Sequence, residues 1–280
     1  MKDVAIIGAG EIGGAIAHVL ARHDLVRSIR LIDETGRVAA GKALDIAQAA
    51  PIEGFATQLS GSTDVSTAAG AAIVILADRA GGDEWQSDEG WLLLKRLTET
   101  AAGAVILCAG VFQRELVDRG VRDLHIRRER LLGSAPEALA GGARALVALA
   151  VKGSPRDVSL SVLGVPPDRT VIPWEDATIA GFALTRLIDE PARRRLGARV
   201  AALWPPGPYA LATAATLVVE ALVGRSRRIA SCFVAPDTSA GTRMRTAALP
   251  VRLGMSGIVD VLTPTLSSVE QIALDNAVQL

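Results

Sequence analysis

The stretch VAIIGAGEIGG at residues 4–14 decides the fold. It is a short apolar run that leads into Gly8, Gly10 and Gly13 in G-x-G-x-x-G spacing, and a helical pattern follows. Asp33 lies twenty residues after Gly13, at the end of a second apolar run, SIRLID. This spacing permits a tight strand-to-helix turn and a close approach of a pyrophosphate to the backbone, and the later acid bonds ribose hydroxyls. The sequence therefore predicts a Rossmann dinucleotide site.

The acid after the second strand also indicates which dinucleotide is bound. A carboxylate at Asp33 repels a 2′-phosphate, so we expect NAD rather than NADP. The alternative is that the glycines serve only the turn that the fold requires. The predicted cofactor-binding residues are Gly8, Gly10, Glu11, Ile12, Gly13, Asp33 and Ala77.

Composition excludes several classes of protein. Half of the 280 residues are apolar, and 30 basic side chains balance 30 acidic ones, which gives no electrostatic reason to expect nucleic acid or an anionic membrane as partner. Cys108 and Cys232 form no C-x-x-C pair, so neither a disulfide framework nor a metal site is predicted. The first strand begins almost at Met1 and the longest apolar run, Ala210–Val219, is too short to cross a bilayer, so we expect a cytoplasmic protein.

The first half of the chain alternates strand and helix patterns, which predicts a parallel sheet covered on both faces. After about residue 134 the pattern changes to a mixture of helices and antiparallel strands. We therefore predict an α/β protein, with a doubly wound Rossmann domain at 1–134 and an α+β domain at 135–280. The expected strands are 3–8, 28–33, 55–60, 71–77, 103–109, 130–133 and 158–164, and the expected helices are 11–22, 37–48, 64–69, 88–101, 138–151, 175–200 with an interruption at Pro191, 210–223 and 267–279. Strands near the C-terminus are expected around turns at 238–241 and 256–257.

The run GAGEIGGAIAHVLARHDLVRSIRLIDETGRVAAGKALDIAQAAPIEGF resembles the opening of the malate/lactate dehydrogenase family. Its segment GKALDIAQAAPI (41–52) is more specific than the glycines. VSLSVLG (158–164) resembles the strand before the family's catalytic histidine, and PVRLGMSGIVDVL resembles its C-terminal β segment. The resemblance implies a Rossmann domain with an α+β substrate domain, a homo-oligomer (dimer or tetramer), and hydride transfer between nicotinamide and a 2-hydroxy acid.

That reaction needs a histidine base, a carboxylate that orients it, an arginine that grips the substrate carboxylate, and a second arginine on a mobile loop. The family motif G-G-H-G-D aligns with residues 164–168, where the base position holds Pro166 and only Asp168 remains. The motif L-D-x-x-R places Leu139 at the carboxylate and Gly142 at the clamp, although Arg144 lies close. The family's S-N-P motif falls on residues 109–111, which read Ala-Gly-Val, and the mobile loop, DRAGGDEWQSDEG, carries five acids and one base.

Other side chains are weak catalytic candidates. Asp78 and Arg79 follow a central strand, but a local ion pair at the strand end is the interpretation we favour. Asp168 is the third candidate, and Glu175 is a further acid–base alternative. We expect His18, His23 and His125 on the surface and Cys108 as a buried, inert thiol. Trp85 and Trp91 either fill the former substrate pocket or pack on the helix that follows them.

Three functions follow. The first is a diverged family member that binds NAD(H) without the family's reaction and acts as a sensor, a regulatory subunit or a partner of an unidentified protein. The second is an active NAD-dependent oxidoreductase acting on the CH–OH group of a different substrate. The third, malate or lactate dehydrogenase activity, is disfavoured because fold likeness cannot replace a missing base and clamp. In a homo-oligomer, the helix at 11–22 and residues 38–50 are the interface candidates.

Overall fold

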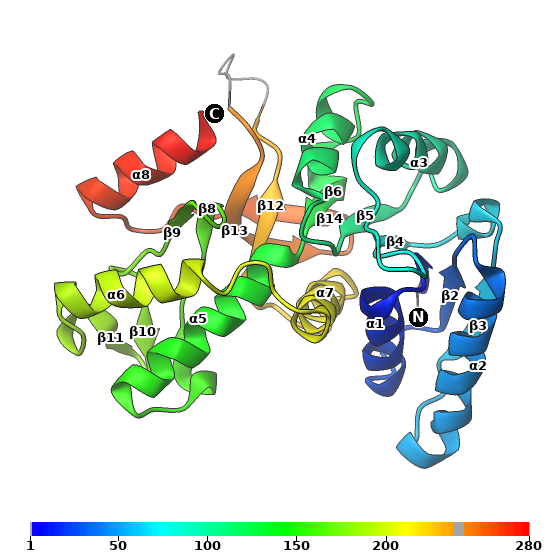
Figure 1. Cartoon of the computed structure of the whole chain (residues 1–280), viewed down its shortest axis with the longest axis horizontal. Helices are drawn as coiled ribbons and strands as arrows, with labels where there is room; N and C mark the ends of the chain where they lie inside the picture. Colours follow the sequence, from blue (N-terminus) through cyan, green and yellow to red (C-terminus); the bar gives the residue numbers. More distant parts are fainter. Residues whose placement is uncertain (1, 238–243, 280) are drawn as a thin grey trace.

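The computed structural model describes residues 2–237 and 244–279, and one large sheet organises them. The strand order is β3-β2-β1-β4-β5-β6-β12-β13-β8-β9, with β14 paired to β13 (Figure 1). The first six strands are parallel and β12 begins the antiparallel part. These strands are β1 (Asp3–Ile7), β2 (Ser28–Ile32), β3 (Gln58–Ser62), β4 (Ile73–Leu76), β5 (Val105–Cys108), β6 (Leu131–Gly133), β8 (Leu163–Val165), β9 (Arg169–Val171), β12 (Ala230–Val234), β13 (Ala247–Gly254) and β14 (Gly257–Val261).

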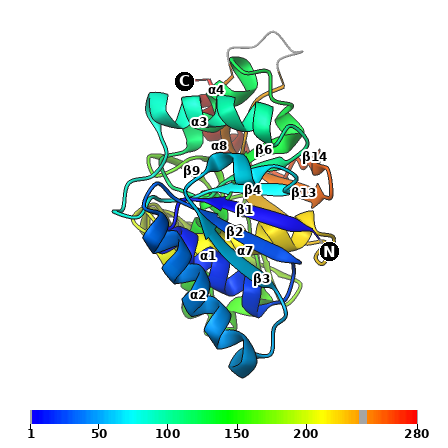
Figure 2. The ribbon, with the colours of Figure 1, turned by 90° about the vertical axis from the view of Figure 1, so that its right-hand side faces the viewer.

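Helices cover both faces of the parallel part of the sheet, as Figure 2 shows. Alternate residues of each strand point to opposite faces, and because both sets are apolar, each face needs a layer of helices to bury it. Val4 and Ile6 of β1 belong to one core, with α1, α2 and α7, whereas Ala5 and Ile7 belong to a second core, with α3 and α4. The helices are α1 (Glu11–Arg22), α2 (Gly36–Glu53), α3 (Ser87–Thr100), α4 (Arg114–Arg122), α5 (Ala135–Val151), α6 (Glu190–Ala201), α7 (Pro208–Leu222) and α8 (Ser268–Val278). This is the predicted doubly wound sheet.

A third core lies under a lobe formed by α5, α6 and a three-stranded sheet. That sheet contains β7 (Val158–Ser159), β10 (Thr178–Ile179) and β11 (Phe182–Ala183). The main sheet runs without a break from β6 to β12, so the parallel and antiparallel parts share main-chain pairing. The division at residue 134 stays a prediction.

Several predicted elements differ from the structure. The helix expected at 175–200 begins only at Glu190, because Pro191 fits the first turn of a helix, where no N–H is needed, and the residues before it form β10 and β11. The single strand expected at 158–164 is two strands, β7 and β8, in different sheets. Helix α4 was missed, and the turn predicted at 238–241 lies outside the described residues.

The last helix was predicted well. Ser267 caps α8 in a capping box in which Glu270 bonds back to the Ser267 N–H. Within the described residues, no helix combines the length and apolarity that crossing a membrane requires.

Candidate functional site: the glycine turn and the loop that covers it

The glycine turn lies at the carboxyl ends of β1 and β4. Gly8 adopts φ +112°, and a Cβ there would lie 2.3 Å from the Asp78 carbonyl oxygen. A Cβ on Gly13 would lie 2.0 Å from the Gly8 carbonyl oxygen. Both positions therefore require glycine, one for the turn and one for the contact between helix and strand. The turn directs the first N–H groups of α1, which have no partner within the helix, toward the crevice.

Those N–H groups are held by a side chain of the same protein. The Asp78 carboxylate accepts hydrogen bonds from the Glu11 N–H at 2.7 Å and from the Gly13 N–H at 3.0 Å. It is buried, and a Cβ on Gly10 would lie 2.3 Å from its Oδ2 atom. An oxyanion thus sits where a Rossmann helix receives a pyrophosphate. The interpretation of Asp78 and Arg79 as an ion pair with each other was wrong, because Asp78 bonds to α1.

Asp33 is likewise engaged by backbone groups. Its carboxylate accepts from the N–H groups of Ala9, Thr35 and Ala80, each at 2.8 Å, and it is buried. The Ala80 bond ties the segment after β4 to the residue that was predicted to bind ribose. Lys42 places a cation beside the same turn, where its Nζ donates to the Gly10 carbonyl at 2.5 Å.

Residues 78–84, which we name the plug loop, fold back on themselves. Asp78 and Glu84 form an antiparallel bridge, and the Arg79 N–H donates to the Asp83 carbonyl at 2.8 Å. Glu84 accepts from the N–H groups of Val111 and Phe112, each at 2.8 Å, after β5. Burial raises the pKa of Glu84 and Asp78 raises it further, while the two backbone bonds oppose both effects. The plug loop therefore joins the ends of β1, β4 and β5.

Residues 85–91, which follow the plug loop, contact it through Arg79. Arg79 pairs with Glu89 at 2.8 Å, and its guanidinium carbon lies 4.7 Å from the centre of the Trp85 ring. Trp85 is buried in the second core, and the Trp91 ring lies under Lys95 and Arg119. Trp85 packs against α3, in agreement with the second of the two alternatives, whereas Trp91 lies on α3 itself and faces Arg119 of α4.

The positions that correspond to the family's catalytic residues are packed rather than merely substituted. Leu139 is buried in the third core, and Pro166 is buried in the β8–β9 turn. A Cβ on Gly142 would lie 2.7 Å from a methyl carbon of Leu203. Arg144 cannot act as a clamp in this arrangement, because it pairs at 2.8 Å with Glu137, a buried carboxylate that also accepts from the Ser231 N–H.

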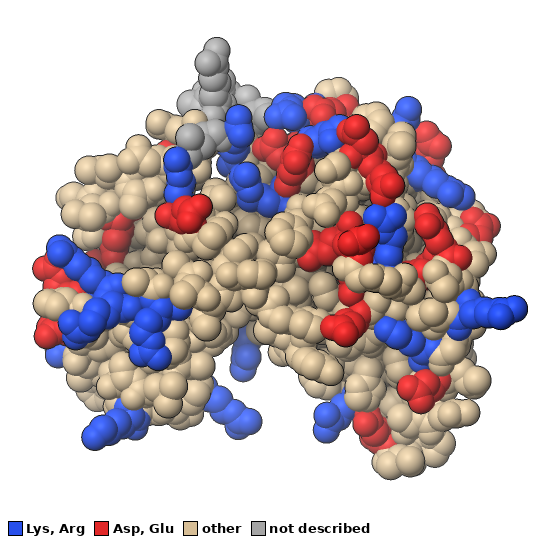
Figure 3. Space-filling view, viewed as in Figure 1, with Lys and Arg blue, Asp and Glu red and all other residues tan. Residues whose placement is uncertain are grey.

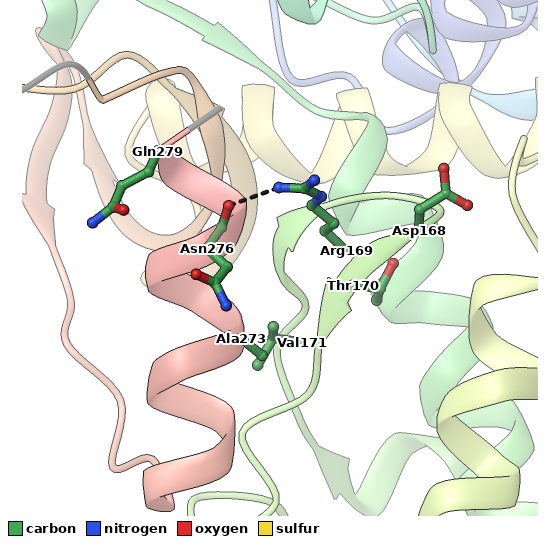
Figure 4. Close-up of a pocket in the computed structure, with 7 residues that line it drawn as sticks. All are labelled: Asp168, Arg169, Thr170, Val171, Ala273, Asn276 and Gln279. Carbon is green, nitrogen blue, oxygen red and sulfur yellow. Dashed lines mark hydrogen bonds between the residues drawn. The ribbon is translucent and has the colours of Figure 1, made fainter.

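The other candidates lie apart from the glycine turn. Asp168 is exposed between β8 and β9, and Figure 4 shows its carboxylate directed away from Arg169, which donates to the Asn276 carbonyl at 2.8 Å. His18 and His23 bond to Glu53 and Glu220 on the surface, and His125 is exposed in a turn after α4 rather than on a helix. Cys108 is buried, and burial raises the pKa of its thiol to about 12, as an inert cysteine requires.

The doubly wound sheet and the glycine turn at its carboxyl edge define a dinucleotide-binding α/β protein. Residues 2–83 match the family model described as lactate/malate dehydrogenase, NAD binding domain. Over 290 residues the chain is 28% identical to malate dehydrogenase of Thermomicrobium roseum, covering 98% of this chain and 94% of the relative. It is also 28% identical to malate dehydrogenase of Thioalkalivibrio sulfidiphilus, covering 99% and 96% of the two chains. Over nearly its whole length the chain is therefore similar to malate dehydrogenases, and its first part matches the NAD-binding domain of the lactate/malate dehydrogenase family.

Solved structures share the fold. Malate dehydrogenase from Salinibacter ruber superposes with a TM-score of 0.88 at 24% identity, covering 98% of this chain and 93% of that one. Lactate dehydrogenase from Cryptosporidium parvum, solved with lactic acid and nicotinamide adenine dinucleotide, superposes with a TM-score of 0.87 at 20% identity, covering 99% and 94%. The predicted fold class is confirmed, and so is the predicted resemblance to malate and lactate dehydrogenases.

The cofactor of the matched domain is NAD, and the glycine turn fits it. The Asp78 carboxylate shows that the α1 donors hold an oxyanion at the expected point. Because those donors are occupied, the Asp78 side chain must move away before a pyrophosphate can bind there. The N–H groups of Glu11 and Gly13 and the Asp33 carboxylate are the groups that would then hold NAD.

Proposed function

We propose that the protein is an NAD(H)-binding member of the family that does not transfer hydride to or from a 2-hydroxy acid, and that it acts as a sensor or regulatory subunit. The observation that carries the proposal is the packing at the base, carboxylate and clamp positions. Pro166 cannot accept a proton, Leu139 lies in a core, and Leu203 lies 2.7 Å from where a Cβ of residue 142 would stand.

When bound, NAD supplies a hydride acceptor or, as NADH, a donor. The residues of this chain hold the cofactor, but none of those at the family's catalytic positions can move the hydroxyl proton. The plug loop bonds to α1 through Asp78, to Asp33 through Ala80 and to the end of β5 through Glu84. Cofactor binding that displaces Asp78 therefore alters the surface near α4, which is how such a protein could signal to an unidentified protein partner.

The oxidoreductase alternative, with Asp78, Asp168 or Glu175 as the acid–base group, is less well supported. Asp78 is committed to the helix α1, and both Asp168 and Glu175 are exposed to solvent. A general base works best in a site that excludes water and lies within hydrogen-bonding reach of the reacting group.

The experiment is calorimetric titration of NADH, with NADPH as control, followed by titration in the presence of oxamate. We expect saturable binding of NADH that oxamate does not tighten, and no oxidation of NADH with oxaloacetate or pyruvate. Turnover in the usual enzymatic range of ~1–10³ s⁻¹, or cooperative binding of NADH and oxamate, would overturn the proposal. Failure to bind NADH would limit the glycine turn to an architectural role.

We also propose that the protein is a homo-oligomer that associates through α2. Leu44 and Ile52 on that helix are 61% and 88% exposed, whereas the apolar side of α1 is already covered within the chain. A second copy of the chain is the occupant that the family relationship favours. Sedimentation of a monomer at micromolar concentration would refute this assembly.

A further inference from the structure

Three arginines from three elements line one cavity of about 170 Å³ beside Pro166. Arg114 is the first residue of α4, Arg169 is the first residue of β9, and Arg245 lies just before β13. Among the residues that the structure describes, none of these three guanidinium groups forms a salt bridge, and Asp168 is the one acid in the lining. The cavity therefore concentrates positive charge in a protein whose overall charge is balanced.

Backbone carbonyls hold two of the guanidinium groups in place. Arg114 donates to the Thr246 carbonyl at 2.9 Å, and Arg169 donates to the Asn276 carbonyl at 2.8 Å. A guanidinium has five N–H donors, so each of these bonds leaves most of the donors for a ligand. Burial lowers the pKa of Arg114 and Arg245 lowers it further, while Asp118 and Glu115 oppose these effects. An anion in the cavity would relieve that repulsion.

The cavity shares lining residues with neighbouring hollows on two sides. It shares Arg114 and Pro166 with a cavity of about 250 Å³. That cavity is also lined by Val111, Phe112, Trp204 and Phe233 and by one acid, Glu115. On the other side it shares Asp168 and Arg169 with an open cleft against α8 (Figure 4). Figure 3 shows basic side chains around the hollow between α4 and α8, with acidic side chains beside them. A ligand with one anionic end and one aromatic or apolar end would match the first pair of cavities.

We propose that Arg114, Arg169 and Arg245 bind the phosphoryl group of a small phosphate monoester, with its organic part between Phe112, Trp204 and Phe233. A phosphate carries about −1.5 to −2 charges at pH 7 and three acceptor oxygens, which suits several guanidinium groups at once. A carboxylate, in contrast, has two acceptor oxygens and is bound bidentately by a single arginine, so it would not need three guanidinium groups. The arginine cavity, of about 170 Å³, is large enough for a phosphoryl group.

The test is calorimetric titration of phenyl phosphate into the protein and into Arg169→Gln and Arg245→Gln, both exposed positions where a substitution leaves the core intact. Arg195→Gln, on the exposed side of α6, removes the same charge elsewhere. We expect saturable binding that weakens at least tenfold in each site variant and less than twofold in Arg195→Gln. Phenyl phosphate should bind more tightly than inorganic phosphate and more tightly than malonate.

Each contrary result is decisive. No saturable binding, or equal weakening in Arg195→Gln, would show that the three arginines form no site. Tighter binding of malonate would overturn the phosphoryl assignment. Equal affinity for phenyl phosphate and inorganic phosphate would overturn the placement of the organic part beside Trp204.

Discussion

Replacing Asp78 by asparagine should strengthen NADH binding while weakening the fold. The Asp78 carboxylate holds the Glu11 and Gly13 N–H groups at 2.7 and 3.0 Å, and hydrogen bonds to a charged group contribute about 1.5–3 kcal/mol each. A pyrophosphate must break both bonds to reach these donors. The neutral asparagine amide has one acceptor oxygen, so it can keep about one of the two hydrogen bonds and competes with the pyrophosphate for the α1 N–H groups with about half the free energy. The difference, about 1.5–3 kcal/mol, corresponds to roughly 10- to 100-fold tighter binding.

The same change removes an anion from the N-terminus of α1, so the free energy of unfolding should fall by about 1–3 kcal/mol in urea titrations without ligand. A rise in NADH affinity together with a fall in the free energy of unfolding would show that the carboxylate competes with the cofactor. A substitution that merely disturbs the fold would lower both quantities. Asp83→Asn is the matched control, because Asp83 is exposed in the same loop and contributes the same charge without bonding to α1. Calorimetry should show its NADH affinity within twofold of the wild type. If Asp78→Asn binds NADH no more tightly than Asp83→Asn, the carboxylate does not compete with the cofactor.

Further predictions concern stability and reactivity. Burial raises the pKa of Glu84, so the folded state favours the protonated carboxyl group. The free energy of unfolding of the wild type, relative to that of Glu84→Gln, should therefore be greatest below the ordinary glutamate pKa and should fall as pH rises through the raised pKa. Urea unfolding between about pH 4 and 8 measures this difference, and a rise with pH would contradict the prediction. Arg144→Ala should cost about 3 kcal/mol of unfolding free energy because it leaves Glu137 buried without its cation, whereas Arg194→Ala, which breaks an exposed pair, should cost less than about 1 kcal/mol. Cys108, with a thiol pKa of about 12, should react with a thiol reagent only after denaturation, and labelling of the native protein at Cys108 would refute its burial.

The sequence predicted the glycine turn better than the loop that covers it. The positions of Gly8, Gly13 and Asp33 follow from local rules, since a tight turn and a fixed strand-to-acid spacing constrain neighbouring residues. Asp78 was identified as lying at the correct sheet edge, but its partners were not. Its bonds to α1 depend on β4 pairing beside β1, and no local pattern specifies which of several N–H groups a side chain reaches across that edge.

Other differences have similar causes. Helix α4, with the sequence RELVDRGVR, contains few apolar residues, so its two buried side chains, Leu116 and Val117, left only a short apolar signal. The break between β7 and β8 depends on which sheet each half joins, which is a tertiary choice. The arginine cavity was missed because its three side chains are far apart in sequence and meet only where α4, β9 and the start of β13 converge.

The unbroken sheet from β6 into β12 limits how the molecule can respond to a ligand. Gly133 and Leu132 pair with Phe233 and Val234, so rotating the two halves about a hinge would rupture main-chain hydrogen bonds in the middle of the protein. Closure of the two halves by rigid-body rotation is therefore costly, and we expect motion to be confined to the loops at the edge of the sheet. The same pairing transmits strain between the halves, so we expect a single cooperative melting transition rather than two.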